Sequence, residues 1–483
     1  MPHGKGGGVL RQFDVLVVGG GVAGLTAATE AARLGLRVGL VERHRIGGTS
    51  LWTGEVPTQA LRQCATVAET ARRAEAFGVR TGTVDVDFPA VIRRVQSVVR
   101  AIQPRRSPEQ LSALGIEPVR GEAAFVKADT LAVGDEELKA RRIVLATGSR
   151  PVPPDVDGLE ETGYVTYESV WDLDRLPSRL AVLGGTPEGV ELAQAFARLG
   201  SQVTLVEPAE TILPSEDGEL VERLIQSLRA VGIDVWTGSR PTQVLRRGDA
   251  KCVAVQNGDG RRELEVQEVL VAGGRVPNVE ALALAATQIE STRTGIVVDR
   301  HFRTAERRVL AVGDVNGKAP WSRAAQIQAL SAVRESVFPA LAVGRRPEVA
   351  WAVFTDPELA HAGMTEYEAR RRLGDRVSTV VQPLADVDRA VCRARTAGLV
   401  KLVLDRQGRL VGGHVLGPEA GEWLPALAWA VATRRRPGVL RPEFFAGATL
   451  SEGVLAAARQ AHEARVYSGW RLAVLKWLAR HGL

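Results

Sequence analysis

Short apolar runs, glycine-rich turns and amphipathic stretches follow one another along the first part of the chain. Residues 13–18 are mostly apolar and predict a buried strand, and residues 25–34 have the spacing of a helix. Between them lies the segment GGGVAG at residues 19–24, and a second apolar run at residues 37–41 ends at Glu42. A strand, a glycine loop, a helix and a second strand followed by an acid predict a dinucleotide-binding unit.

Each residue type in this unit has a physical task. Gly19 permits the tight turn after the strand, Gly21 lets the backbone approach a pyrophosphate, and Gly24 allows the helix to pack closely on the strand. The phosphates are expected at the helix N-terminus. Glu42 lies eighteen residues after Gly24, where a carboxylate accepts hydrogen bonds from a ribose diol.

The same order of elements recurs in the middle of the chain. Residues 180–183 and 203–206 predict strands, and residues 190–199 predict a helix. The glycine loop is GGTPEG at residues 184–189, and Glu207 follows the second strand. The chain therefore carries two dinucleotide-binding units.

The second glycine loop departs from the pattern. Thr186 stands where the first unit has its second glycine, so its side chain would crowd a pyrophosphate, and Pro187 removes an amide donor. The second unit therefore either binds a nucleotide or only preserves the fold. If it binds, Glu207 favours NADH over NADPH, because a carboxylate repels a 2′-phosphate.

Composition and charge narrow the classes of protein. The 483 residues predict two to four domains, and no run approaches the ~18 apolar residues of a membrane span. The net charge is +6 and the basic residues are scattered, which argues against nucleic-acid binding. The start of the chain lacks an apolar signal core, and three cysteines exclude a disulfide framework, so a cytoplasmic protein is expected. Core thiols are expected at Cys64, Cys252 and Cys392.

Several further segments resemble the flavin-dependent pyridine nucleotide-disulfide oxidoreductases, the family of dihydrolipoamide dehydrogenase, glutathione reductase and mercuric reductase. The resemblance covers residues 11–464 and is nearest to the mercuric reductase branch. It rests on the two units and on RIVLATGSR (142–150), VLVAGGRVPN (269–278), VLAVGD (309–314), VFTDPELAHAG (353–363), ELAQAFARLG (191–200) and PEAGE (418–422).

This resemblance implies an α/β fold with two Rossmann-like dinucleotide-binding domains, for FAD and NAD, and a C-terminal α+β dimerisation domain. The implied parts are the FAD domain at 1–165 and 271–345, the NAD(P) domain at 166–270, the dimerisation domain at 346–465 and a C-terminal helix at 466–483. A homodimer is implied, with FAD and NADH as cofactors and no metal site. The expected FAD residues are Gly19, Gly21, Gly24, Glu42, Gly48, Thr49, Ala123, Thr147, Gly148 and Asp314, and the expected NAD residues are Gly184, Gly189, Glu207 and Gly274.

The departures from the family gather where its chemistry takes place. Ser50 and Glu55 occupy the positions of the two redox cysteines, and neither side chain can form a disulfide. Gln59 replaces the lysine expected near the flavin, and Gly447 replaces the histidine base. The C-terminal cysteine pair of mercuric reductase is also missing. The remaining candidates for catalysis are Glu55, Glu191 (the former partner of the missing lysine) and Glu452.

Two of the candidate side chains have alternative interpretations. Glu55 either exchanges protons with an acceptor from a partly buried cleft, or is a solvated or arginine-paired loop residue. Arg323 either lies near the flavin pyrimidine or, as the sequence favours, is a surface or interface arginine.

The best-fitting function is transfer of hydride from NADH through FAD to a non-disulfide acceptor: a quinone, dioxygen, a small electrophile or a partner protein. The alternatives are a redox-silent FAD-binding scaffold or sensor, and a mercuric or disulfide reductase-like enzyme that uses thiols of a partner.

Residues 466–483 extend past the usual end of the family. An apolar stripe with two tryptophans and flanking basic residues suits a membrane-surface helix, whereas packing on the dimerisation domain is the more common fate of such a stripe. The stripe consists of Val466, Tyr467, Trp470, Ala473, Val474, Trp477 and Leu478.

Overall fold

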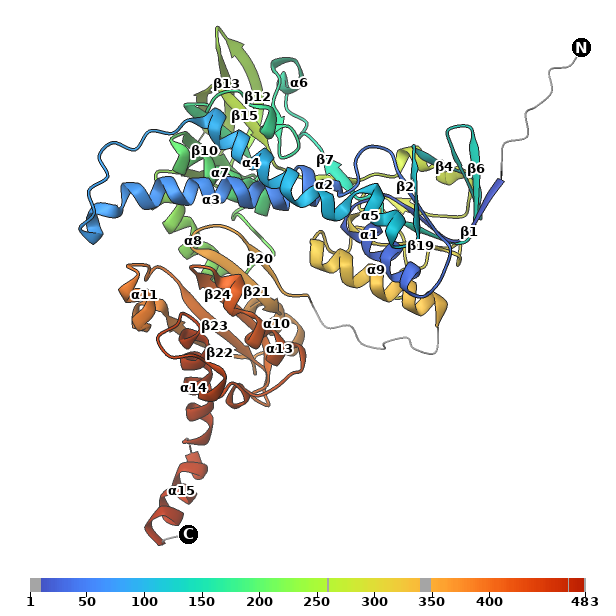
Figure 1. Ribbon diagram of the computed structural model, residues 1–483. Helices are drawn as coiled ribbons and strands as arrows, with labels where there is room; N and C mark the ends of the chain where they lie inside the picture. The colour runs from blue at the N-terminus through green and yellow to red at the C-terminus, as the bar shows by residue number, and fades with distance from the viewer. Residues whose placement is uncertain (1–9, 259, 339–348, 468, 482–483) are drawn as a thin grey trace, which may run out of the picture.

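The structure is a computed structural model that describes residues 10–258, 260–338, 349–467 and 469–481. Three sheet-based parts lie side by side, and a C-terminal helix projects from the lowest of them in the view of Figure 1. The boundary expected between residues 345 and 346 lies outside the described residues. The α/β architecture expected from the sequence is confirmed.

The first part is built on a seven-stranded sheet whose parallel centre carries the first glycine loop. The apolar runs pair in register, with Val15 opposite Val38 and Val18 opposite Val41. Helix α1 (Val22–Arg33) covers this sheet and packs against α9 (Ser322–Val337), which returns from far along the chain. The strands are β3 (Ile116–Arg120), β2 (Val38–Glu42), β1 (Leu10–Val18), β6 (Glu136–Leu145), β5 (Thr130–Val133), β4 (Ala123–Lys127) and β19 (Val309–Ala311).

The second part repeats the plan with a five-stranded parallel sheet and an antiparallel three-stranded flap. Helix α7 (Pro187–Leu199) follows its glycine loop, and α8 (Gly218–Ala230) follows the next strand. The sheet consists of β11 (Asp234–Trp236), β10 (Gln202–Val206), β9 (Arg179–Leu183), β15 (Glu268–Val271) and β8 (Val165–Thr166), and the flap of β12 (Arg240–Arg247), β13 (Ala250–Asn257) and β14 (Gly260–Val266).

Two long helices join the first and second parts. Helix α3 (Glu55–Arg72) leaves the first part and packs on α7, while α4 (Phe88–Ile102) packs on α3 (Figure 1). Their apolar faces merge with those of α7 and α8 into one core, which includes Phe88 and Phe196 with ring centroids 5.9 Å apart. This shared core fixes one dinucleotide-binding unit relative to the other.

The C-terminal part is a five-stranded antiparallel sheet with helices on it. Its apolar side packs on α13 (Pro425–Ala432) and α14 (Glu452–Val466). The strands are β20 (Trp351–Val353), β21 (Glu358–Gly363), β24 (Leu410–Gly417), β23 (Leu399–Leu404) and β22 (Ser378–Pro383). The remaining helices are α2 (Gly48–Trp52), α5 (Pro108–Ala113), α6 (Leu159–Thr162), α10 (Glu366–Leu373), α11 (Asp388–Cys392), α12 (Ala420–Trp423) and α15 (Gly469–His481).

Two expectations about the chain need correction. The tail is not one helix from residue 466, because Val466 ends α14 and a separate helix, α15, begins at Gly469. The thiols are not all in the core: Cys252 is buried, Cys64 is partly exposed and Cys392 is exposed. Residues 482–483 of the predicted tail lie outside the described residues, and so does the side chain of Trp470.

Candidate active site

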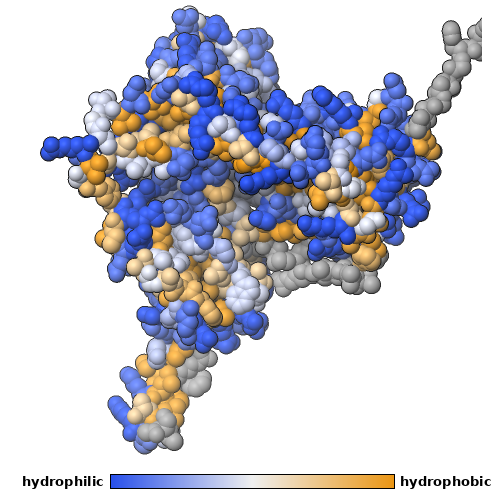
Figure 2. Space-filling model, in the orientation of Figure 1, coloured by the Kyte–Doolittle hydropathy of each residue, from blue (hydrophilic) through white to orange (hydrophobic). Residues whose placement is uncertain are grey.

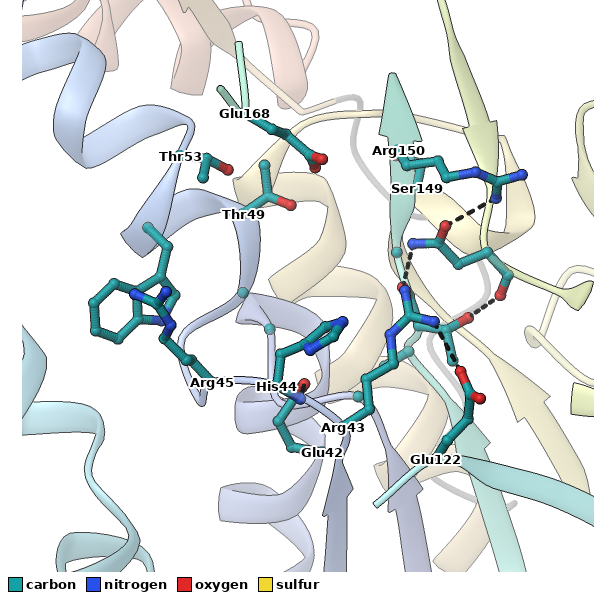
Figure 3. Close-up of a pocket in the computed structure, with 18 of the residues that line it drawn as sticks. Glu42, Arg43, His44, Arg45, Thr49, Thr53, Glu122, Ser149, Arg150 and Glu168 are labelled. Carbon is teal, nitrogen blue, oxygen red and sulfur yellow. Dashed lines mark hydrogen bonds and ion pairs between the residues drawn. The ribbon is translucent and has the colours of Figure 1, made fainter. Parts of the chain in front are cut away.

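A cavity of about 840 Å³ opens beside the first glycine loop. Figure 3 shows Glu42 and Thr49 on its walls, with Ser149 and Arg150 across from them. Nine of the ten expected FAD residues line this cavity or the one that adjoins it, and they come from the first glycine loop and from distant segments around it. The exception is Gly24, where a Cβ would lie 1.8 Å from the carbonyl oxygen of Gly19, so its task is packing.

The loop fits the pyrophosphate of FAD. A Cβ on Gly21 would meet only the Cα of Gly48, 3.8 Å away, so any side chain there would project into the cavity. Gly21 is also the N-cap residue of α1 and gives no side-chain hydrogen bond to the helix. The first backbone N–H groups of α1 are therefore left for an anion.

Glu42 is held in place by the backbone on both sides. Its Oε2 accepts a hydrogen bond from the Gly20 N–H at 2.6 Å, and its Oε1 accepts one from the His44 N–H at 2.7 Å. Each carboxylate oxygen keeps a lone pair for a ribose hydroxyl. Farther along the wall, Arg150 donates to Glu280 and holds the pKa of that carboxyl at about 2.

A second cavity of about 880 Å³ lies where the three parts of the chain meet. It shares Gly21, Thr49 and Gly148 with the first cavity, so the two adjoin. Ser50 and Glu55 line it together: the Ser50 hydroxyl donates to Glu55 Oε2 at 3.1 Å. The positions that correspond to the redox cysteines are therefore adjacent, as a disulfide would need, but carry a hydroxyl and a carboxylate.

Glu55 is the first residue of α3 and is exposed, not a member of a loop. None of the cysteines among the described residues lines either cavity. Burial raises the pKa of the Cys64 thiol, which lies nine residues farther along the same helix.

Glu191 is partly buried and also lines the second cavity. Among the described residues it accepts one hydrogen bond, from the backbone N–H of Phe354 at 2.8 Å. Gln59 brings no charge, and the nearby Arg62 bonds to Gln59 and Glu358 instead. Burial, with no cation in contact, raises the pKa of Glu191 to about 8, so the group is mostly a neutral proton donor at pH 7.

A partly buried arginine that the sequence motifs did not single out, Arg275, connects the two units. Arg275 donates to Asp314 and Glu188, each at 3.0 Å, and to the Ser149 hydroxyl at 2.9 Å. Its guanidinium lies 4.9 Å from the ring of Tyr167, and burial raises the pKa of that phenol. Asp314, one of the expected FAD residues, is therefore already held by an ion pair with Arg275. Arg275 could have been found from the sequence, because it is the arginine of the segment VLVAGGRVPN that carries the family resemblance.

The expected NAD residues do not line either cavity. These residues are Gly184 and Gly189 in the second glycine loop, together with Glu207 and Gly274. Pro187 and Glu188, at the start of α7, do line the second cavity. The Thr186 hydroxyl caps α7: it accepts from the Gly189 N–H at 3.3 Å and donates to the Ala272 carbonyl at 2.8 Å.

The remaining candidates lie at the edge of the cavities or away from them. Arg323 is exposed, lines the second cavity and donates to Gln326. Glu452 begins α14 and Gly447 lies in the exposed segment before it, and neither lines either of these two cavities. In the described ranges no three His, Cys, Asp or Glu side chains gather into a group that could hold a metal ion.

Two glycine-loop units that meet at adjoining cavities define a two-nucleotide flavin oxidoreductase. The family model for pyridine nucleotide-disulphide oxidoreductases matches residues 13–335, and the model for the dimerisation domain of that family matches residues 349–458. The chain belongs to this family, whose members use FAD and NAD(P)H, and the dimerisation domain indicates a homodimer. The family membership expected from the sequence is confirmed.

Individual relatives agree with this assignment. A mercuric reductase from Bacillus cereus is 31% identical over 445 residues, which cover 92% of this chain and 70% of the relative. A dihydrolipoyl dehydrogenase from Chlorobaculum tepidum is 32% identical, with 92% and 96% covered. A solved structure, the HOCl-induced flavoprotein disulfide reductase RclA from Escherichia coli in a Cu(II) complex, superposes with a TM-score of 0.82 at 26% identity, with 93% and 99% covered.

Proposed function

We propose that this chain is an NADH-dependent flavin oxidoreductase that passes electrons to a non-disulfide acceptor without a redox dithiol. The observation that carries the proposal is the Ser50–Glu55 hydrogen bond at the position of the family's cysteines. A hydroxyl and a carboxylate cannot shuttle electrons, but they can hold and move a proton. The acceptor would be a quinone, dioxygen, a small electrophile or a partner protein.

FAD, when bound, supplies the redox chemistry, because its flavin accepts a hydride and can pass electrons on. The residues of this chain have three tasks. Gly21 and Glu42 bind the cofactor, and Glu191 holds a proton on the side of the second unit. Glu55, exposed to water, exchanges protons with the acceptor side while Ser50 orients it.

One observation favours a second candidate, a redox-silent FAD scaffold. Thr186 already uses the amide of Gly189 that a pyrophosphate would bind, and Pro187 has no amide to offer. The two candidates differ in whether NADH reduces the bound flavin. Purified holoprotein should bleach rapidly at the flavin absorbance band when mixed anaerobically with NADH, and more slowly with NADPH. Flavin that stays oxidised with both nucleotides would establish the scaffold.

We also propose that α15 contacts an anionic membrane surface, as a peripheral attachment of a cytoplasmic enzyme. In Figures 1 and 2 this helix projects from the body and shows apolar residues on its surface. Trp477 is 54% exposed and Val474 is 44% exposed, and residues 465–483 contain four Lys or Arg and no acid. Indole rings and basic side chains suit the interface of an anionic bilayer. No helix among the described residues is long and apolar enough to cross a bilayer.

Sedimentation with vesicles tests this attachment. Full-length holoprotein should sediment with phosphatidylcholine–phosphatidylglycerol vesicles at low salt and not with phosphatidylcholine alone, whereas a chain ending at Tyr467 should bind neither. Phe444→Ala, which removes another exposed aromatic beside an arginine, is the control and should bind normally. Vesicle binding by the truncated chain would show that α15 is not the attachment. A truncated chain that is monomeric where the full chain is dimeric would show that α15 packs on a second subunit. Either result overturns the membrane proposal.

A further inference from the structure

A chain of hydrogen bonds runs from the C-terminal part of the fold to the second cavity. The backbone N–H of Gly421 donates to Glu358 Oε1 at 2.7 Å, and Glu358 Oε2 accepts from Arg62 Nη2 at 2.9 Å. The other terminal nitrogen of Arg62, Nη1, donates to Gln59 Oε1 at 3.0 Å. Gln59 and Arg62 both belong to α3, and of the two only Gln59 lines the cavity.

These contacts hold Arg62 in one place. Its partner Glu358 is only 3% exposed, so water screens their ion pair weakly. The guanidinium also lies 5.7 Å from the ring centroid of Phe354, a residue of the same cavity. Arg62 therefore meets Gln59 from a position that the C-terminal part of the fold determines.

The contact with Arg62 decides which end of the Gln59 amide faces the cavity. A guanidinium has only donors, so the amide atom that faces Arg62 must be the oxygen. The Nε2 group of Gln59 then points away from Arg62. Among the described residues it makes no hydrogen bond, and it is not one of the side-chain atoms buried without a partner, so it is open to the cavity. Gln59 therefore presents an uncharged hydrogen-bond donor.

The order of the two cavities identifies the ligand that reaches this donor. FAD consists of an ADP half and a flavin half that are joined at the pyrophosphate. Glu42, whose carboxylate is available to the ribose of the ADP half, lines only the first cavity, whereas Gly21, at the expected pyrophosphate position, lines both. The second cavity therefore receives the flavin half, whose ring carbonyls and nitrogens accept hydrogen bonds.

We propose that Gln59 donates a hydrogen bond to the flavin ring of bound FAD, and that Arg62 is the positioning residue that holds the amide in the donating orientation. Without Arg62 the amide can turn over and present its carbonyl oxygen, which cannot bond to an acceptor atom of the ring. The inference rests on FAD binding and not on any electron acceptor, so it goes beyond the proposed function.

Titration of the full-length apoprotein tests both residues, with FAD and ADP as the two probes. Gln59→Leu should raise the Kd for FAD roughly threefold to tenfold, which is the contribution of one hydrogen bond, and should leave the Kd for ADP within about twofold. Arg62→Met should also raise the Kd for FAD, and it should shift the absorption bands of the bound flavin as Gln59→Leu does. The double variant should bind FAD no more weakly than Gln59→Leu, because Arg62 acts through Gln59.

Two further variants serve as controls. Arg72→Met removes an arginine of α3 that lines neither cavity, and it should change neither Kd. If Arg62→Met does not fold, because Glu358 is left buried without its cation, Arg62→Met combined with Glu358→Gln replaces it.

Three results would overturn the inference: an unchanged Kd for FAD in Gln59→Leu, an equal loss of ADP binding, or effects of the two substitutions that multiply in the double variant. Flavin that NADH does not reduce would overturn the proposed function alone, since these titrations need no NADH.

Discussion

The two dinucleotide-binding units hold their acids in the same way. Glu42 accepts from the Gly20 N–H at 2.6 Å and from the His44 N–H at 2.7 Å. Glu207 accepts from the Gly185 N–H at 2.6 Å and from the Ala209 N–H at 2.7 Å. Strand, loop and acid are therefore kept in both copies, whatever either copy binds.

The units differ at the helix start. In the first, Gly21 leaves the amides of α1 free and opens onto the cavity. In the second, the Thr186 hydroxyl satisfies an amide of α7 from within the chain. A single residue at the N-cap thus decides whether the same backbone presents an anion site or a closed helix end.

The largest effect is expected on FAD affinity, when a side chain at position 21 fills the cavity beside the first glycine loop. Gly21→Val should place a branched side chain in the FAD cavity without a clash in the protein, since the nearest atom to its Cβ is 3.8 Å away. FAD affinity should fall by at least ~100-fold, because the side chain takes the place of the pyrophosphate. The ratio of flavin absorbance to protein concentration measures the bound FAD, and circular dichroism checks that the variant is folded.

Thr186→Val is the matched substitution in the second unit and should retain FAD. Full flavin content in Gly21→Val would contradict the comparison between the two units.

The next effect concerns Glu191, which lies two residues after Gly189 as Thr26 does after Gly24. Folding raises the pKa of Glu191 to about 8, so it favours the protonated form. The stability this contributes is complete below about pH 4.5 and is lost as the pH rises through about 8. Glu191→Gln, always neutral, should be more stable than the native chain by about 2 kcal/mol at pH 9 and similar to it at pH 5. Thermal unfolding at both pH values checks this, and equal shifts at both would contradict the assigned protonation.

The smallest effect is expected on the KM for NADH, when the side-chain cap of α7 is removed. Thr186→Gly frees the Gly189 amide and should lower the KM for NADH roughly threefold to tenfold, at a cost of a few tenths of a kcal/mol in helix capping. Steady-state rates with saturating acceptor measure it. An unchanged or higher KM would mean that the nucleotide does not bind at this helix end.

Local patterns predicted the glycine loops, and the family resemblance predicted distant cavity residues such as Asp314, but neither predicted the contacts between side chains of separate elements. Glycine loops and their acids are read from adjacent residues, and both helices were predicted. Each begins three residues earlier than its apolar spacing indicated, at Val22 and Pro187, because the first turn contains glycines and polar residues instead of a hydrophobic stripe. The stack of Trp321, Trp351 and His361 could not be predicted, since the three rings come from separate elements.

The C-terminal tail is a second place where a local pattern was not sufficient. The sequence predicts one helix over residues 466–483, but α14 ends at Val466, where the backbone N–H of Tyr467 donates to the Glu463 carbonyl. Composition predicts that such a segment is helical. It does not predict where α14 ends, because helix ends depend on tertiary packing.

The central claim is that electrons pass through this enzyme without a dithiol, and an anaerobic reductive titration tests it most directly. Holoprotein titrated with NADH should reach fully reduced flavin after about one equivalent per FAD, because only the flavin takes up electrons. An endpoint near two equivalents, with a long-wavelength band from a thiolate beside oxidised flavin, would reveal a second two-electron centre and contradict the account.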